Sequence, residues 1–312
     1  MKSAQVSINI LNYNTYSKTK VCIESCLKQV GVSYTVLLID NNSTDGSFET
    51  LKEEYGGQIE YLRNNDNYGF AKGNNLGVEY CLKRGIKYSL LLNSDTELVG
   101  ESLLSNLYDT MKSNQKVAIV SPSIYTVTNV GLQIQATDSI YLRLLRFVGV
   151  LPKNRVFSVT NRMRSFAHGS ALFVDNQCFS QMGGFPEHYF MYGEEFTLSK
   201  KMLWSGYLII ENSSKNCYIL HHHDKTGKIE PWRLYLMGRN TSIEYCENHA
   251  GKSRWWFWVF YILYIKSGIK AIMRGNSSYY YGMHKGLLLY KKGSSYQEIF
   301  EDAKLARECF RR

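Results

Sequence analysis

The stretches LLIDNNSTDGS (residues 37–47) and YSLLLNSDTEL (residues 88–98) decide the fold of this 312-residue chain. Each begins as a short apolar run bounded by turn-forming residues, which is the pattern of a buried strand. Asp40 closes the first run, and Asp95 follows the second. In an open parallel sheet, ligands bind beyond the carboxyl ends of the strands. Two carboxylates at that edge need a cationic or hydrogen-bonding partner, which a nucleotide with its divalent metal would supply.

The amino-terminal part of the chain alternates between strand and helix patterns, as βαβ units do. We expect strands at residues 5–11, 34–40, 58–62, 88–93 and 117–120. We expect helices at residues 17–29, 47–55, 70–84 and 101–113. This half therefore predicts an α/β fold with a doubly wound, mostly parallel sheet flanked by helices.

The pattern beyond residue 120 is less regular. Residues 121–165, rich in Thr, Asn and Arg, predict loops over the site, and later runs predict further elements. These are a strand at 166–176, a helix at 195–205 and a strand at 207–211. The last 60 or so residues are aromatic, basic and helical in pattern.

We therefore expect a catalytic domain at 1–245 followed by a basic, aromatic, helical extension at 246–312. Within the domain, residues 1–120 would bind a nucleotide, and residues 121–245 would supply the acceptor site and a catalytic base.

The formal charge of +10 is concentrated at one end of the chain. Residues 251–312 hold 12 Lys and Arg against 4 Asp and Glu, a net charge of +8. Such an end suits an anionic surface. A nucleic-acid-binding protein is an alternative, because the tail mixes basic and aromatic residues, but it would leave the acidic motifs unexplained.

The tail contains the apolar run RWWFWVFYILYI at residues 254–265. It is shorter than the roughly 20 residues that span a bilayer. Aromatic residues flanked by cations predict a segment that lies at a membrane interface. A buried core helix or a homodimer interface is the alternative. With no secretory signal at the amino terminus, we expect a cytoplasmic protein, peripheral at the inner face of the cell membrane.

The seven cysteines are scattered and odd in number. Cys22 and Cys26 have helical i, i+4 spacing but lack the further Cys or His partners of a zinc site. Reduced thiols are therefore expected.

Two segments predict ligand contacts at the sheet edge. The segment NNDNYGFAKGNNLG at 64–77 places Gly69, Gly73 and Gly77 four residues apart on a helix. Glycine disfavours helices, so either a phosphate or ribose approaches closely or the helix packs tightly on the sheet. In the segment NSDTE at 93–97, alternate oxygen-bearing residues share one side, which suits Mg²⁺ or Mn²⁺.

A third segment, GGFPEHYFMYGEEFTLSKKMLWSGY at 183–207, places Glu194 and Glu195 at the start of a helix. Two acids there have an ordinary explanation in the helix dipole. Alternatively, an aromatic surrounding would desolvate one of them and raise its pKa, as suits a general base.

Together the four segments resemble family 2 of the glycosyltransferases, the inverting enzymes of the GT-A fold. The resemblance covers residues 5 to about 245, with the motifs in the family's order. Within the family the chain is most similar to bacterial rhamnosyltransferases of polysaccharide and O-antigen synthesis.

The resemblance implies roles for individual residues. Asp40 would bind the base of the donor nucleotide, and Asp95 would be the main metal ligand, with Asn93 replacing the first acid of the family's motif. Glu195, or its neighbour Glu194, would be the catalytic base; the family often has an Asp at the position of Thr197. The nucleotide-sugar site would be lined by Asn12, Asp40, Asn42, Asn67, Gly69, Lys72, Asn75, Asn93, Ser94 and Asp95.

The histidines of ILHHHDKTGK at 219–228 resemble a family segment near the diphosphate, so His221 or His222 would contact the diphosphate or the metal. A solvated loop is the alternative for these three adjacent histidines. Arg239 and Asn240 match a family pair, for which a salt bridge is an equal explanation.

The implied reaction moves a sugar, with rhamnose as one candidate, from a dTDP- or UDP-sugar to a hydroxyl of a lipid-linked oligosaccharide. Mg²⁺ or Mn²⁺ would be the cofactor. We expect an anionic membrane surface to be a partner, and we do not expect the protein to bind nucleic acid. Removing the tail after residue 250 is expected to spare hydrolysis of the donor. A sugar-1-phosphate nucleotidyltransferase is an alternative, but it needs a Gly-rich loop where this chain has NYNTYSKTK at 12–20.

Overall fold

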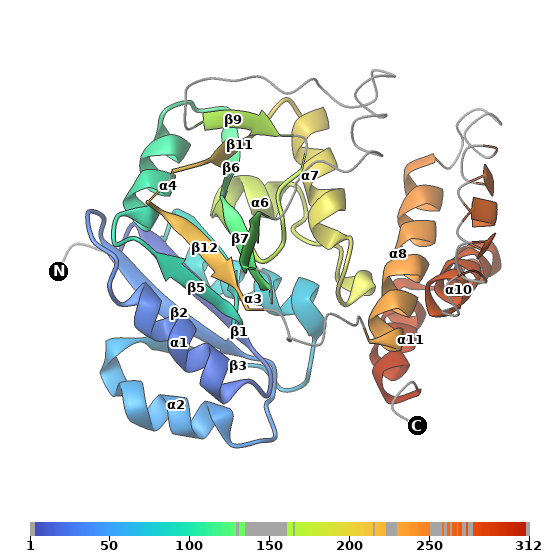
Figure 1. Cartoon of the computed structure of the whole chain (residues 1–312), viewed down its shortest axis with the longest axis horizontal. Helices are drawn as coiled ribbons and strands as arrows, with labels where there is room; N and C mark the ends of the chain where they lie inside the picture. Colours follow the sequence, from blue (N-terminus) through green and yellow to red (C-terminus); the bar gives the residue numbers. More distant parts are fainter. Residues whose placement is uncertain are drawn as a thin grey trace. The chain divides into compact units, whose positions relative to one another are not determined.

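The structure of the protein is a computed structural model (Figure 1). The chain folds into two compact units. The first unit comprises residues 1–185 and 198–225, and the second comprises residues 186–197 and 226–312. The structure describes residues 4–128, 131–134, 161–164, 166–214, 216–222, 230–249, 258, 261–262, 264–266, 268–269, 273 and 277–309.

The first unit is built on a mixed sheet with the strand order β3-β2-β1-β4-β10-β6-β11-β9. Strands β3, β2, β1 and β4 run parallel, as do β6 and β11, whereas β10 and β9 are antiparallel to their neighbours. The bounds are β1 (Val6–Asn12), β2 (Tyr34–Asp40), β3 (Glu60–Arg63), β4 (Tyr88–Asn93), β6 (Val117–Pro122), β9 (Asn161–Arg164), β10 (Ala171–Asp175) and β11 (Leu208–Asn212). The expected α/β fold is confirmed.

Helices cover this sheet because both of its faces are apolar. Leu37 and Ile39 lie in a buried cluster with Cys81 of α3, and Leu38, which points to the opposite face, is equally buried. The helices are α1 (Tyr16–Cys26), α2 (Ser47–Tyr55), α3 (Gly69–Lys83), α4 (Leu103–Lys112), α6 (Asn176–Gln181) and α7 (Glu194–Trp204), with short 3₁₀ turns η1 (Gly56–Gln58) and η2 (Glu187–Tyr189). The expected helices therefore form within a few residues of their predicted bounds.

A second sheet has the strand order β5-β12-β7-β8. Its strands are β5 (Thr96–Val99), β12 (Tyr218–His221), β7 (Ile124–Thr128) and β8 (Gly131–Ile134). The prediction of loops over residues 121–165 is therefore wrong for β7, β8 and β9. Ile, Tyr, Thr and Val in β7 favour a pleated strand, whereas β8 and β9 form through pairing with β7 and β11. The rest of that prediction, at 129–130, 135–160 and 165, lies outside the described residues.

The strand expected at 166–176 is shorter, because a turn at His168–Ser170 precedes it and Asp175 ends it. The Asp175 carboxylate accepts hydrogen bonds from the backbone N–H groups of Gln177 and Cys178, which makes it the amino-terminal cap of α6.

The second unit combines α8 (Pro231–His249), α10 (Ser278–Lys292) and α11 (Tyr296–Cys309) with the segment 186–197. The domain boundary expected at residue 245 lies inside α8. Helices α8 and α10 approach each other through glycines: a Cβ atom on Gly282 would lie 2.0 Å from the carbonyl oxygen of Tyr235.

Among the described residues, no helix has the length and apolar character needed to cross a membrane. The run at 254–265 lies mostly outside the described residues. Those of its side chains that are described include Trp258 and Ile262, which are 59% and 62% exposed. All seven cysteines are free, and Cys22 and Cys26 are buried.

Candidate active site

Asn12 and Asp40 face each other at the carboxyl ends of β1 and β2. The Asn12 amide donates a hydrogen bond of 2.8 Å to the Asp40 carboxylate. The same carboxylate accepts from the backbone N–H and the hydroxyl of Ser43, at 2.9 and 2.6 Å. Both side chains are fully buried. In the described contacts, Asp40 therefore holds the turn after β2, and its contact with a nucleotide base stays a prediction.

A hydrogen-bonded chain continues from Asn12 toward the end of β4. The Asn12 amide oxygen accepts from the hydroxyls of Thr15 and Thr19, at 2.9 and 2.8 Å. The Thr15 hydroxyl in turn lies 2.9 Å from that of Ser94. Three predicted residues from three strand ends, Asn12, Asp40 and Ser94, are thus brought into one polar network.

The loop after Asp40 and the start of α3 are joined by asparagines. The Asn41 amide donates to the Gly69 carbonyl oxygen at 2.8 Å and accepts from the Asn64 amide at 2.8 Å. The Asn67 side chain accepts from the Gly69 N–H at 3.0 Å. Asn42 has a left-handed backbone conformation, with φ of 61°. Asn67 and Gly69 therefore form the amino-terminal end of α3, and the Asn42 amide donates at 3.3 Å to the Asn65 carbonyl oxygen in the segment before it.

Gly73 and Gly77 serve packing. A Cβ atom on Gly73 would lie 2.7 Å from Leu11, and one on Gly77 would lie 2.3 Å from Ile39. These contacts favour close approach of α3 to the sheet as the reason for both glycines. Gly69, at the helix start with φ of 72°, differs from them because its backbone conformation suits glycine.

Lys72 and Asn75 lie on α3. The Lys72 ammonium lies 4.3 Å from the centre of the Tyr68 ring. The Asn75 amide makes two hydrogen bonds of 2.9 Å with the backbone N–H and carbonyl of Phe185. Asn75 therefore fixes the turn at Gly184 and Phe185, a structural role that the sequence did not indicate.

Asp95 and His221 meet because β5 pairs with β12, with Thr96 opposite His221. The His221 Nε2 atom lies 3.1 Å from the Asp95 carboxylate. The next histidine, His222, places its Nε2 atom 3.0 Å from the Glu97 carboxylate. His223 lies outside the described residues. Of the two histidine candidates, His221 is the one whose side chain contacts the Asp95 carboxylate, whereas His222 donates its backbone N–H to the Asp95 carbonyl oxygen at 2.8 Å.

The Asp95–His221 pair fits a divalent ion. A carboxylate oxygen and an imidazole nitrogen about 3 Å apart can share one ion. The part of the chain that the structure describes contains no cluster of three His, Cys, Asp or Glu for a metal. Mg²⁺ and Mn²⁺ sites of this kind take their remaining ligands from substrate phosphates and water. The residues present therefore fit an ion that arrives with a diphosphate.

His168 was missed by the sequence reasoning, which treated its surroundings as a strand. Its ring packs edge-on to the His221 ring, with centroids 6.2 Å apart, and its Nδ1 atom lies 3.0 Å from the Ser170 hydroxyl. The motif His-Gly-Ser at 168–170 was the available signal, since it precedes a strand that pairs with β4.

Glu194 and Glu195 belong to the second unit, at the start of α7. Glu194 is buried, and its Oε2 atom has no hydrogen-bond partner among the described residues. Glu195 accepts from the Gly193 N–H at 3.2 Å. Burial and then the neighbouring Glu195 charge raise the pKa of Glu194 well above its ordinary value, and burial raises the pKa of Glu195. A raised pKa makes a carboxylate a stronger base than an ordinary glutamate, as general-base chemistry requires.

The chain was compared with known proteins. The low-salt glycan biosynthesis hexosyltransferase Agl10 of Haloferax volcanii is 28% identical over 191 residues, which cover 61% of this chain and 59% of that protein. An N-acetylglucosaminyl-diphospho-decaprenol L-rhamnosyltransferase of Mycobacterium tuberculosis is 35% identical over 89 residues, 28% of this chain and 27% of that protein. The chain thus matches about three fifths or less of the length of these relatives.

Two solved structures are similar in fold. GalNAc-T7 with UDP, GalNAc and Mn²⁺ has a TM-score of 0.59 and 15% identity, covering 78% of this chain and 48% of that one. TarS 1–349 of S. aureus in complex with UDP has a TM-score of 0.53 and 15% identity, covering 78% and 65%. At this identity the likeness concerns the fold, and it confirms the expected GT-A-like architecture.

The family model for glycosyl transferase family 2 matches residues 7–170, from β1 to the His168 motif. Because this match covers more than half of the 312 residues, the chain belongs to glycosyl transferase family 2.

Proposed function

We propose that the protein transfers a sugar from a nucleoside diphosphate sugar to an acceptor hydroxyl, with inversion at the anomeric carbon. The observation that supports this most is the Asp95–His221 pair at the carboxyl edge of the sheet, 3.1 Å apart. Ligands of open α/β sheets bind at this edge. The family membership supports the same reaction class.

In the proposed reaction, Glu195 or Glu194 removes the proton from the acceptor hydroxyl. The oxygen then attacks the anomeric carbon from the face opposite the diphosphate, whose bond to the sugar breaks. Asp95 and His221 would hold a divalent ion, Mg²⁺ or Mn²⁺. When bound, such an ion neutralises the charge that develops on the departing diphosphate. Asn42, Asn67 and Lys72 would contact the nucleotide part of the donor.

The donor would be a UDP- or dTDP-sugar, and rhamnose is one candidate for the sugar. Support comes from the relative in Mycobacterium tuberculosis, which is named a rhamnosyltransferase, and from the UDP in the similar solved structures. That relative's name also includes a diphospho-decaprenol, which supports a lipid-linked glycan as acceptor here.

Such an acceptor would place the protein at the inner face of the cell membrane, as a peripheral protein in cell-surface polysaccharide synthesis. The exposed side chains of Trp258 and Ile262, together with the net charge of +8 in residues 251–312, support contact with anionic lipid. A homodimer through this part of the chain is the competing explanation for the exposed apolar residues.

The test is a panel of UDP- and dTDP-sugars with Mn²⁺ or Mg²⁺, in which release of the nucleoside diphosphate is measured. We expect release with one donor, and its loss in excess chelator. Asp95→Ala should lower turnover by about 10²-fold or more, as removal of a group that stabilises developing charge typically does. Asp45→Ala, an exposed acid on the turn after β2, is the matched control. Full turnover in chelator would contradict the metal role, and no release with any donor would contradict the function.

A further inference from the structure

The loop that precedes Glu194 has an unusual backbone. Phe190, Tyr192 and Gly193 have positive φ angles of 66°, 73° and 95°. For the two aromatic residues, this left-handed conformation is sparsely populated and persists only where the surroundings impose it. Something must therefore hold residues 189–193 in place.

Asn240 of α8 holds this loop through backbone contacts. Its amide nitrogen lies within hydrogen-bond distance of three carbonyl oxygens, those of Tyr189, Met191 and Tyr192, at 3.2, 2.8 and 2.7 Å. One side chain thus binds the backbone on both sides of Phe190 and at Tyr192. Its contacts are to main-chain atoms, so they depend on the path of the loop.

Arg239 fixes the orientation of that amide. The Nε and Nη2 atoms of Arg239 donate to the Asn240 side-chain oxygen, at 3.0 and 2.7 Å. A guanidinium can only donate, so the Asn240 oxygen must face it and the amide nitrogen must face the loop. Arg239 also donates to the Tyr189 carbonyl oxygen at 3.2 Å.

Arg239 is in turn held by α11. Its side chain is fully buried and donates to the Ile299 carbonyl oxygen and, at 3.3 Å, to the Asp302 carboxylate. The same carboxylate accepts from the Tyr235 hydroxyl at 2.8 Å. The guanidinium therefore links three parts of the second unit: the loop, α8 and α11.

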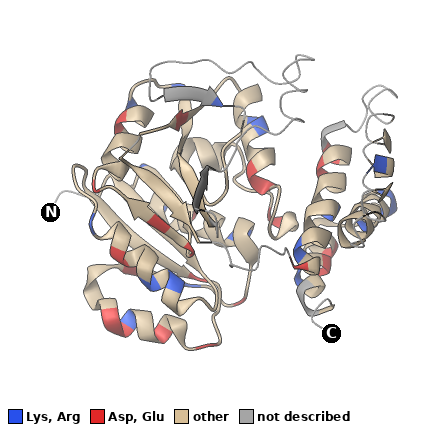
Figure 2. Cartoon of the chain, viewed as in Figure 1, with Lys and Arg blue, Asp and Glu red and all other residues tan. Residues whose placement is uncertain are grey.

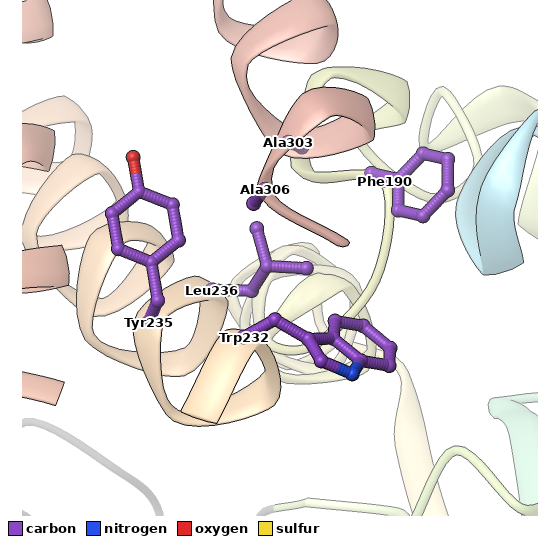
Figure 3. Packing of buried hydrophobic residues seen from close by; sticks show 6 residues of the cluster. All are labelled: Phe190, Trp232, Tyr235, Leu236, Ala303 and Ala306. Atoms are coloured by element: carbon purple, nitrogen blue, oxygen red, sulfur yellow. The ribbon is translucent and has the colours of Figure 1, made fainter. Parts of the chain in front are cut away.

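Apolar packing supports the same loop. Figure 3 shows Phe190 beside Trp232 and Leu236 of α8 and Ala303 and Ala306 of α11, with which it forms a buried cluster. The Phe190 side chain is thus anchored by this cluster, and the backbone on either side of Phe190 is anchored by Asn240.

We propose that Arg239 and Asn240 are positioning residues, which hold the 189–193 loop so that the first turn of α7 presents Glu194 and Glu195 in a reactive geometry. This inference rests on the proposed function, since it gives the pair a purpose only if one of these carboxylates is the base. A displacement of about 1 Å in a reacting group can lower a rate by 10²-fold. Arg239 forms the salt bridge considered from the sequence, with Asp302. In this proposal the salt bridge holds the guanidinium that orients the Asn240 amide.

The test compares Asn240→Ala, Asn240→Asp and Arg239→Lys with Thr241→Ala, a control at the exposed neighbouring position of α8. Two quantities are measured in the full-length protein: hydrogen exchange of the backbone amides at 189–197, and kcat and KM for the donor. Asn240→Asp is nearly isosteric but places an acceptor against three carbonyl oxygens. It should therefore be at least as harmful as Asn240→Ala if hydrogen bonding to the loop is what matters.

We expect exchange at 189–193 to accelerate by 10-fold or more in both Asn240 variants. We expect kcat to fall by about 10²-fold, with the donor KM changed by less than 2-fold, because the donor residues lie elsewhere in the sequence. Arg239→Lys should show the same pattern, since a lysine cannot orient the amide with two donors. Thr241→Ala should match the wild type in both measurements.

Unchanged exchange in Asn240→Ala would overturn the anchoring role. Accelerated exchange with unchanged kcat would overturn the positioning role while leaving glycosyl transfer intact. A wild-type protein that turns over no nucleotide sugar would instead contradict the proposed function, and the exchange data would still decide whether the pair anchors the loop. Should Asn240→Asp fail to fold, Asn240→Ala and Arg239→Lys decide the outcome.

Discussion

At the scale of single residues, four acids that the sequence singled out have different surroundings. Asp40 is buried and accepts from Asn12 and Ser43, Asp95 lies beside His221, and the Glu194 and Glu195 pair is desolvated. The sequence could predict which acids matter, because their positions at strand and helix ends are visible in it. The family resemblance placed His221 or His222 near the metal of Asp95, but the sequence could not predict that Asn12 holds Asp40, because these residues come from distant parts of the chain.

Asp40→Ala should destabilise the protein. The change leaves the buried Ser43 N–H without its acceptor, which costs about 1–3 kcal/mol, and it removes one of the three acceptors of the Asn12 amide, which keeps the Ser43 and Ser47 hydroxyls. Equilibrium unfolding in urea should show a lower midpoint, whereas the control Asp109→Ala, at an exposed acid of α4, should stay within about 0.5 kcal/mol of the wild type. An Asp40→Ala protein of wild-type stability that no longer binds donor would instead assign Asp40 to the nucleotide.

The rate of the proposed reaction should depend on pH through the glutamate pair. A base must be ionised, and the raised pKa of Glu194, due to burial and then to Glu195, delays ionisation to a pH above the ordinary value of about 4.3. We therefore expect kcat to rise with pH through an apparent pKa above 4.3, which belongs to the pair. The base itself is the residue whose change to Gln lowers kcat by about 10²–10⁴-fold.

Measured between pH 5 and 9, the two variants separate the roles. If Glu194 is the base, Glu195→Gln stays active and its acid limb moves to lower pH, because a like charge has been removed. If Glu195 is the base, Glu194→Gln stays active. Two active variants with the wild-type pH profile would show that neither carboxylate is the base.

Folding stability should also depend on the protonation of Glu194. It should fall as pH rises, whereas kcat should rise. Because the folded pKa of Glu194 is raised, the stability contributed by its protonated form is present below the unfolded value of about 4.3 and is lost as pH rises through the folded pKa. Glu194→Gln should remove this loss, so unfolding in urea at pH 5 and pH 8 should differ less than in the wild type.

At the scale of helices and strands, the sequence predicted those elements whose pattern is local. Helices α1 to α4 and strands β1 to β4 form where the apolar spacing predicts them. The strands β7, β8 and β9 were missed, because their identity depends on pairing with partners far along the chain. The close approach of α8 and α10 was missed for the same reason: a glycine in a helix shows its packing partner only in the folded structure.

Gly282→Ala should destabilise the second unit. A Cβ atom there would lie 2.0 Å from the Tyr235 carbonyl oxygen and 3.0 Å from the Arg239 backbone nitrogen, so the α8 and α10 backbones must move apart. Overpacking of this kind costs about 1–3 kcal/mol. Gly57→Ala is the control, because among the described residues, its chain neighbours aside, no atom lies within 4 Å of its added Cβ atom. Thermal unfolding measures both, and equal midpoints would contradict the close helix contact.

At the scale of the whole chain, the two units differ in how well the sequence accounts for them. The family match at 7–170 lies within the first unit, and the sequence motifs describe that unit well. The second unit joins the segment 186–197 to the helices at the end of the chain, a grouping that no local pattern shows.

The carboxyl-terminal tail also contributes to the structure of the second unit, because α11 accepts hydrogen bonds from Arg239. Truncation after residue 250 should therefore impair turnover, contrary to the expectation from sequence.

A net charge of +8 is concentrated in residues 251–312, which belong to this second unit. Figure 2 shows Lys and Arg, together with Asp and Glu, along its helices. Large apolar side chains are exposed there too, among them Trp258, Ile262, Ile269 and Met273. Cations beside exposed aromatic and aliphatic groups suit the interface of an anionic bilayer.

Point changes test membrane contact without removing the helices that hold Arg239. The double variant Trp258→Asp and Ile262→Asp should lose most of its binding to vesicles that contain anionic lipid, because charge replaces two exposed apolar groups. Val30→Asp, at an exposed apolar residue of the first unit, is the matched control and should bind as the wild type does. High salt should weaken wild-type binding only in part. Salt screens the basic residues, each of which contributes at most about 1 kcal/mol, but it does not screen the apolar contact.

Flotation with anionic and neutral vesicles measures this binding, and donor hydrolysis should be unchanged in both variants. A wild-type protein that stays unbound at low salt, and whose dimer in light scattering is abolished by the double variant, would assign these side chains to a subunit interface.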